Sequence, residues 1–108
     1  MRELTDQNFQ AATAQGLWMV HFWSPTCAPC RVIEPMFLRL EETYAPDLQF
    51  GAVNGKVELE TGLSQQIQGY PTILTYKDGQ PLGMLFGVRP FRTYQETADA
   101  LRQLRVVS

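Results

Sequence analysis

The chain has two cysteines, and they lie three positions apart in the stretch WSPTCAPC, which runs from Trp23 to Cys30. Cysteines at this spacing serve as a structural disulfide, as part of a metal site, or as a reactive dithiol. A disulfide that closes so small a loop constrains the unfolded chain little, so it stabilises a fold weakly. A structural zinc site takes four ligands, whereas this chain offers two cysteines and one histidine. The pair therefore favours a redox role, with a metal site shared across a dimer and two inert buried thiols as open alternatives.

The reactivity of the pair depends on where the fold places each thiol, because the thiolate is the nucleophile. The apolar run from Leu17 to Trp23 predicts a buried strand, and the segment after Cys30 repeats apolar residues at helical spacing. Cys27 then lies at a helix N-terminus, where unpaired N–H groups and the helix dipole favour negative charge. We expect Cys27 to attack a substrate disulfide, and Cys30, one turn further into the helix, to resolve the mixed disulfide.

Further patterns predict the elements that position this pair. The helix after Cys30 should be kinked, because Pro35 lies inside its apolar pattern. The other expected elements are a helix over about 6–15 capped by Thr5, a strand over 48–54, a short helix over 59–68, a hairpin turning at Asp78 and Gly79, and a last helix opened by a capping box of Thr93 and Glu96. This order indicates an α/β fold, with a central mixed sheet of about four strands and helices on both faces.

Composition narrows the class of protein. The chain has 108 residues, 44% of them hydrophobic, which predicts a single domain over residues 1–108. The net charge is −2 without a block of like charges, so we expect no nucleic-acid partner and no membrane surface. The N-terminal segment lacks the apolar stretch of a signal peptide. We therefore expect a cytoplasmic monomer, in a reducing compartment where close cysteines are catalytic or metal-binding more often than structural.

Beyond the cysteines, the sequence resembles the thioredoxin family over nearly its whole length. The stretch VHFWSPTCAPCRVIEPMFLRL is similar to the family's active-site strand and helix, and GYPTILTYKDG, from Gly69 to Gly79, is similar to the loop that carries its cis-proline. A CxxC pair alone is common, but here Trp23 precedes it and Pro35 follows it. The resemblance implies the thioredoxin fold and an enzyme that reduces protein disulfides.

The resemblance also implies what each active-site residue does. Cys27 would be the exposed nucleophile, Cys30 the buried resolving thiol, and Pro29 the residue that sets the redox balance between them. The resemblance implies no bound cofactor and no metal. The implied partners are disulfide-containing protein substrates and an electron donor of the thioredoxin-reductase type.

The implied substrate contacts come from two loops. Trp23 would pack under the active-site loop, and Pro71 would be cis, with the backbone of Tyr70 pairing with the substrate chain beside Cys27. Thr26 replaces the aromatic residue that usually precedes the first cysteine, so the choice of partner can differ. Ala28 gives the atypical active site Cys-Ala-Pro-Cys, in which glycine usually precedes the proline.

His21 is the most consequential departure from the family pattern. The family commonly has a buried aspartate at this position and a lysine at the position of Ala52, and both are missing. One interpretation makes His21 a core histidine with a satisfied hydrogen bond. The sharper hypothesis makes neutral His21 the acceptor of the Cys30 proton, directly or through water, with a pKa that governs the pH profile near neutrality.

Two other functions fit the same residues. A disulfide oxidase or isomerase would share the fold and the dithiol but have a higher reduction potential. A redox-sensing binding module would use the dithiol only to switch a protein contact.

Overall fold

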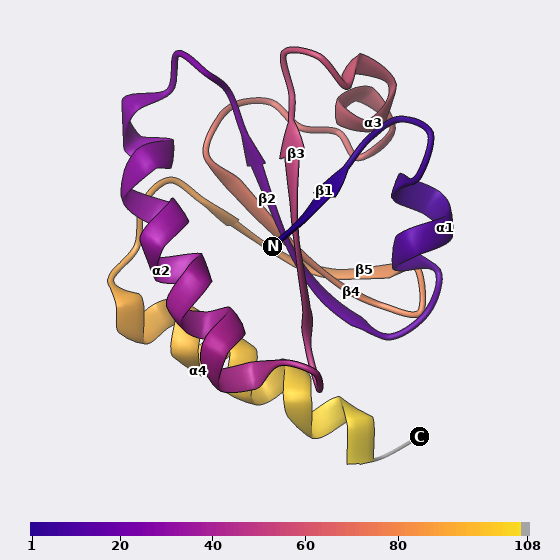
Figure 1. Ribbon diagram of the computed structural model, residues 1–108, viewed down its shortest axis with the longest axis vertical. Helices are drawn as coiled ribbons and strands as arrows, with labels where there is room; N and C mark the ends of the chain where they lie inside the picture. Colours follow the sequence, from indigo (N-terminus) through magenta and orange to yellow (C-terminus); the bar gives the residue numbers. More distant parts are fainter. Residues whose placement is uncertain (107–108) are drawn as a thin grey trace.

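The computed structural model describes residues 1–106, which form a five-stranded mixed sheet covered by helices on both faces (Figure 1). The strand order is β1-β3-β2-β4-β5. The strands are β1 (Arg2–Leu4), β2 (Leu17–Trp23), β3 (Gln49–Asn54), β4 (Thr72–Lys77) and β5 (Gln80–Phe86). The helices are α1 (Phe9–Thr13), α2 (Ala28–Tyr44), α3 (Leu59–Ser64) and α4 (Phe91–Gln103), followed by the 3₁₀ turn η1 (Leu104–Val106).

The sheet has one strand more than the sequence predicts. The additional strand, β1, pairs in parallel with β3, and only Leu4 of its three residues is buried. Three residues are too few to show the alternation of apolar and polar residues that identifies a strand, so the sequence pattern does not predict β1. The predicted domain of residues 1–108 extends two residues beyond the described part of the chain.

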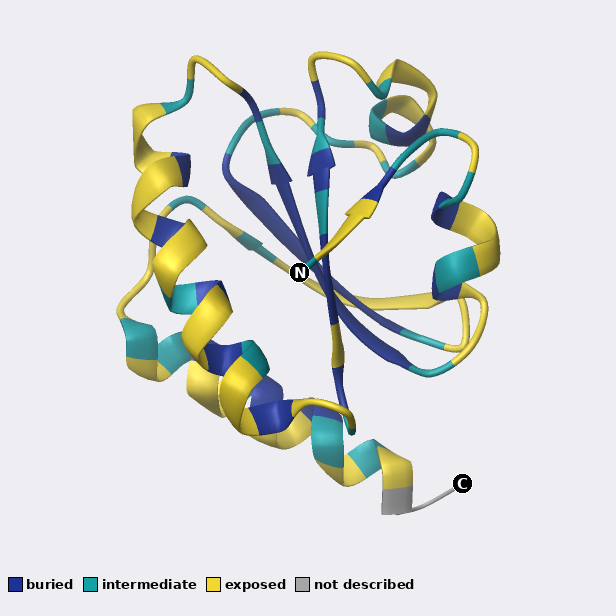
Figure 2. Cartoon of the chain, in the orientation of Figure 1, coloured by how far each residue is buried: buried dark blue, intermediate teal, exposed yellow. Residues whose placement is uncertain are grey.

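The central strand is β2, as its apolar run predicts. It pairs in parallel with β3 and antiparallel with β4, and its first six residues are buried. Both of its faces are covered by helices, which explains why the run is apolar throughout instead of alternating. Figure 2 shows this strand and its neighbours as the buried centre of the molecule.

Alternate side chains of β2 enter two separate cores. Val20 and Phe22 belong to the cluster that α1 covers. Met19 belongs to the cluster packed against α2 and α4. His21 follows Met19 at the two-residue period of a strand, so its side chain lies on the α2 face. Its ring centroid is 5.6 Å from that of Phe37 on α2.

The helix starts differ from the predicted ones. The N-cap of α1 is Asn8, and Thr5 instead forms a turn with Asn8 just before the helix. The predicted capping box of Thr93 and Glu96 does not form, because α4 already begins after Pro90. The fixed φ of proline suits a helix start, and the N-cap, Pro90, lies three residues ahead of the predicted N-cap, Thr93.

Candidate active site

Cys27 and Cys30 form a disulfide at the junction between β2 and α2, and their Cα atoms are 5.4 Å apart. Cys27 is the N-cap of α2, and its Sγ accepts a hydrogen bond of 3.2 Å from the backbone N–H of Cys30. Pro29 lies in the first turn of the helix, where a missing N–H costs nothing. Cys27 is half-buried, whereas Cys30 is 4% exposed. The sulfur that the helix N-terminus stabilises therefore belongs to the more accessible cysteine.

Ser24 holds the turn that leads to Cys27, and sequence reasoning missed this role. Its carbonyl accepts the Cys27 N–H at 3.1 Å, and its hydroxyl accepts the Thr26 N–H at 3.2 Å. The hydroxyls of Ser24 and Thr26 are a further 3.1 Å apart. Ser24 is buried and Thr26 is exposed. The Thr26 side chain thus supports the turn while also facing solvent beside the disulfide.

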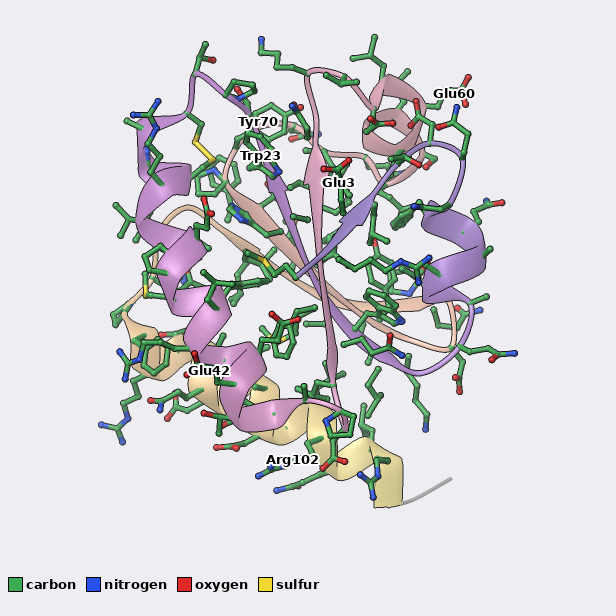
Figure 3. All side chains as sticks on the ribbon, in the orientation of Figure 1. Glu3, Trp23, Glu42, Glu60, Tyr70 and Arg102 are labelled. Atoms are coloured by element: carbon green, nitrogen blue, oxygen red, sulfur yellow. A yellow bond between two sulfur atoms is a disulfide. The ribbon has the colours of Figure 1, made fainter. Side chains whose placement is uncertain are left out.

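The loop before β4 contains the cis peptide bond between Tyr70 and Pro71. The Pro71 carbonyl accepts a hydrogen bond of 3.0 Å from Gly87, and the Thr72 hydroxyl donates to the Gly69 carbonyl at 2.7 Å. The first bond connects the loop to the residue after β5, and the second closes the loop on itself. Figure 3 shows Tyr70 and Trp23 at the end of the sheet that carries the disulfide.

Gly55 connects Trp23 with Tyr70, and sequence reasoning missed it as well. Its N–H donates to the Trp23 carbonyl at 2.8 Å. A Cβ at Gly55 would collide with the Tyr70 ring, so the aromatic side chain packs directly over the glycine backbone. The signal in the sequence is a glycine just after a strand, which is typical of close backbone approach.

A groove of about 710 Å³ opens beside the disulfide, and we call it the disulfide groove. Residues from β1, β2, β3 and α2 line it, including both cysteines, Trp23, His21 and Ala52. His21 and Ala52 are paired across β2 and β3. The small Ala52 side chain leaves space next to the histidine that a longer side chain would fill.

His21 is the buried titratable group of this groove. It is 3% exposed, and its Nε2 has no hydrogen-bond partner among the described residues. Burial lowers the pKa of His21 to about 4, because desolvation penalises the charged imidazolium. This pKa lies well below the neutral range in which His21 is expected to titrate from the sequence, while its interpretation as a core histidine stays a prediction. At pH 7 the side chain is neutral and keeps one acceptor nitrogen.

Within residues 1–106, no group of three or more His, Cys, Asp or Glu side chains is placed to hold a metal ion. In the same range, no helix is both long enough and apolar enough to cross a membrane.

Comparison with known proteins agrees with this geometry. A family model described as Thioredoxin matches residues 1–100. The thioredoxin of Bacillus subtilis (strain 168) is 32% identical over 95 residues, covering 88% of this chain and 91% of that protein. The thioredoxin of Listeria monocytogenes is 31% identical over 99 residues, covering 92% and 96%. The chain therefore belongs to the thioredoxin family and is a thiol–disulfide oxidoreductase, a protein-disulfide reductase that works through its CxxC dithiol.

Proposed function

We propose that Cys27 is the attacking sulfur of this reductase and Cys30 the resolving one. The unequal exposure of the two cysteines carries this assignment, since only Cys27 offers its sulfur to a protein substrate. The N–H of Cys30 also donates to the Cys27 sulfur, and a hydrogen bond of this kind favours the thiolate over the thiol.

The proposed reaction has two exchanges. The Cys27 thiolate attacks one sulfur of a substrate disulfide, that S–S bond breaks, and the departing substrate thiolate takes a proton from solvent. Cys30 then loses its thiol proton and attacks the Cys27 sulfur. The mixed disulfide breaks, and the second substrate thiolate leaves and is protonated. The substrate gains two electrons and two protons, and the protein is left with the Cys27–Cys30 disulfide.

His21 is proposed to receive the Cys30 proton, directly or through water. His21 and Cys30 line the same groove, and the neutral imidazole has a free acceptor at pH 7. A group with a pKa of about 4 is a weak base, so it passes the proton onward instead of storing it. His21 then acts as a relay to solvent, and the pH profile near neutrality reports the thiols.

The remaining site residues are proposed to bind the substrate or to tune the dithiol. A substrate segment would cross between Trp23 and the Tyr70–Pro71 loop, which lie at one end of the sheet (Figure 3). Thr26 and Ala28 are exposed beside Cys27, so they would contact the same segment. Ala28 and Pro29 would tune the reduction potential, because they shape the turn that holds the two sulfurs.

An external electron donor must return the disulfide to the dithiol after each turnover. We propose a donor of the thioredoxin-reductase type and a reducing compartment, the cytoplasm, for a monomeric protein. The relatives found by comparison carry the name thioredoxin, which supports this assignment.

Trapping tests the assignment of the two cysteines. A Cys30→Ser variant should accumulate mixed disulfides with a protein substrate through Cys27, because the resolving sulfur is missing. A Cys27→Ser variant is the matched control and should trap nothing. Trapping by Cys27→Ser alone would reverse the assignment. Mass spectrometry after acid quenching identifies the bonded cysteine.

The lifetime of the mixed disulfide tests the relay. In a single turnover, His21→Leu should lengthen that lifetime by about 100-fold, the usual size of a lost proton-transfer group. Met19→Leu alters the same face of β2 without removing a proton acceptor, and it should leave the lifetime unchanged. An unchanged lifetime in His21→Leu between pH 6 and 8 would remove His21 from the mechanism.

A further inference from the structure

The disulfide groove carries an unbalanced charge. Three glutamates are among its lining residues: Glu3 on β1, Glu34 on α2 and Glu58 just before α3. Arg31 and the N-terminal residue Met1 are the lining residues that carry a positive charge. Figure 3 places Glu3 at the end of the sheet that carries Trp23. The net charge of the groove depends on which of these charged groups already form ion pairs.

The Met1 ammonium does not offset the three carboxylates, because it is already paired. It donates to Oε1 of Glu41 at 2.7 Å and forms an ion pair there. Glu58 accepts a hydrogen bond of 2.8 Å from the backbone N–H of Asp6, which is a neutral donor and leaves the charge in place. Among the lining residues, three glutamates therefore remain against one arginine, Arg31.

His21 adds an independent feature to the same groove. The side chain is 3% exposed, and its Nε2 has no hydrogen-bond partner among residues 1–106. A buried polar atom without a hydrogen-bond partner is uncommon in folded proteins, so it indicates that a hydrogen-bonding ligand reaches this site. One nitrogen of a neutral imidazole accepts hydrogen bonds, and so do the carboxylates of the three lining glutamates.

We propose that the disulfide groove binds a lysine or arginine side chain of the substrate, near the cysteine that Cys27 attacks. This inference rests on the proposed function, because it says which substrate disulfides the dithiol prefers: those with a basic residue near the cysteine. An ammonium or guanidinium brings only N–H donors and a positive charge, which the carboxylates can receive. The groove is large enough for such a side chain and the residues next to it, and the aromatic Trp23 is among its lining residues.

The topology separates this groove from the cis-proline loop. β3 and β1 lie on one side of β2, while β4, which the Tyr70–Pro71 loop precedes, lies on the other. A substrate segment that crosses beside Tyr70 can therefore extend past Trp23 and place one side chain in the groove. The cation would lie a few positions from the reacting cysteine.

Matched peptide disulfides test the proposal with chemically reduced wild-type protein. Six peptides each carry one lysine within three positions on either side of the cysteine, and six partners carry glutamine instead. At low salt, at least one lysine peptide should be reduced about tenfold faster than its glutamine partner, as expected for a few partly exposed ion pairs. The preference should shrink in 0.5 M NaCl, because salt screens exposed charges.

Two double variants with equal net charge distinguish the effect of the charges in the groove from the effect of the net charge of the protein. Glu3→Gln with Glu34→Gln should reduce the tenfold preference to about threefold or less. Glu42→Gln with Glu96→Gln, on outer faces of α2 and α4, should keep it. Equal rates for all six pairs in the wild type, or equal losses in both variants, would overturn the proposal. If no peptide is reduced at all, the proposed function fails together with it.

Discussion

Trp23 and Tyr70 are held at one end of the sheet through Gly55, whose backbone binds Trp23 and whose missing side chain admits the Tyr70 ring. We predict that Gly55→Ala moves Tyr70 and lowers kcat/KM for a protein disulfide by about tenfold, with a loss of about 1–3 kcal/mol in the free energy of unfolding. Steady-state kinetics and urea unfolding measure the two effects.

Gly62 provides the control for that substitution. It lies inside α3, and a Cβ there would have nothing within 4 Å. Gly62→Ala should stabilise the protein by about 0.5–1 kcal/mol and leave the kinetics unchanged, because alanine favours a helix over glycine. A Gly55→Ala variant with wild-type kinetics would show that the position of Tyr70 does not matter for turnover.

Residue types alone identify the dithiol, but they do not give the surroundings of each side chain. The spacing of Cys27 and Cys30, followed by an apolar helical pattern, is sufficient to place a sulfur at a helix start. The pKa of His21 is different, since it depends on how deeply the ring is buried. That burial comes from packing between segments distant in the chain, which local sequence does not encode.

Among the elements, the β4–β5 hairpin has the strongest local signal. Asp78 and Gly79 both have positive φ, at 48° and 83°, as the two-residue turn requires. The turn is also attached to the loop before β2, because Asp78 Oδ1 accepts the Gly16 N–H at 2.8 Å. The hairpin therefore fixes the end of the sheet opposite to the disulfide.

We predict that Gly79→Ala lowers the free energy of unfolding by about 1–2 kcal/mol, because an alanine is strained at this φ. Asparagine tolerates the left-handed region better, so Gly79→Asn should lose less. Urea unfolding gives both values. The rate of disulfide reduction should stay at its wild-type level, since the turn lies at the far end of β4 from Pro71. If both variants were as stable as the wild type, the turn would not limit the stability of the fold.

Element boundaries were harder to predict than the elements themselves. Leu17–Trp23 matches β2 residue for residue, because a run buried on both faces has sharp ends. α1 spans only Phe9–Thr13, although the pattern suggested 6–15, because the segment before Asn8 forms turns stabilised by Thr5. Side chains that can cap a helix can also form such turns, and tertiary contacts decide between them.

At the scale of the whole molecule, the sequence was sufficient for the layered α/β arrangement and the active end of the sheet. β2 and β3 run in parallel, so their carboxyl ends meet there, and antiparallel β4 begins at the same end. This order brings the end of β2, the start of α2 and the loop before β4 to one end of the sheet (Figure 1). The groove was not predictable, because β1 contributes Glu3 to it and a three-residue strand leaves no pattern.

The burial of His21 also makes the stability of the whole molecule depend on pH. The folded state holds its pKa at about 4, whereas the unfolded chain has the ordinary value of 6.5. Between these values the unfolded state binds a proton that the folded state does not, so the free energy of unfolding decreases as the pH falls from 6.5 to 4. The loss attributable to His21 reaches about 3 kcal/mol.

A comparison of wild type with His21→Leu isolates this effect. Asp6 titrates below this range, because a hydrogen bond from the Thr61 side chain lowers its pKa. Both proteins contain the same carboxyl groups, so only the difference between their unfolding curves reports His21. Urea unfolding at several pH values from 4.5 to 7.5 should show a flatter pH dependence for His21→Leu. Parallel curves would mean that the imidazole is protonated in the folded state and that water reaches it far more freely than its 3% exposure indicates.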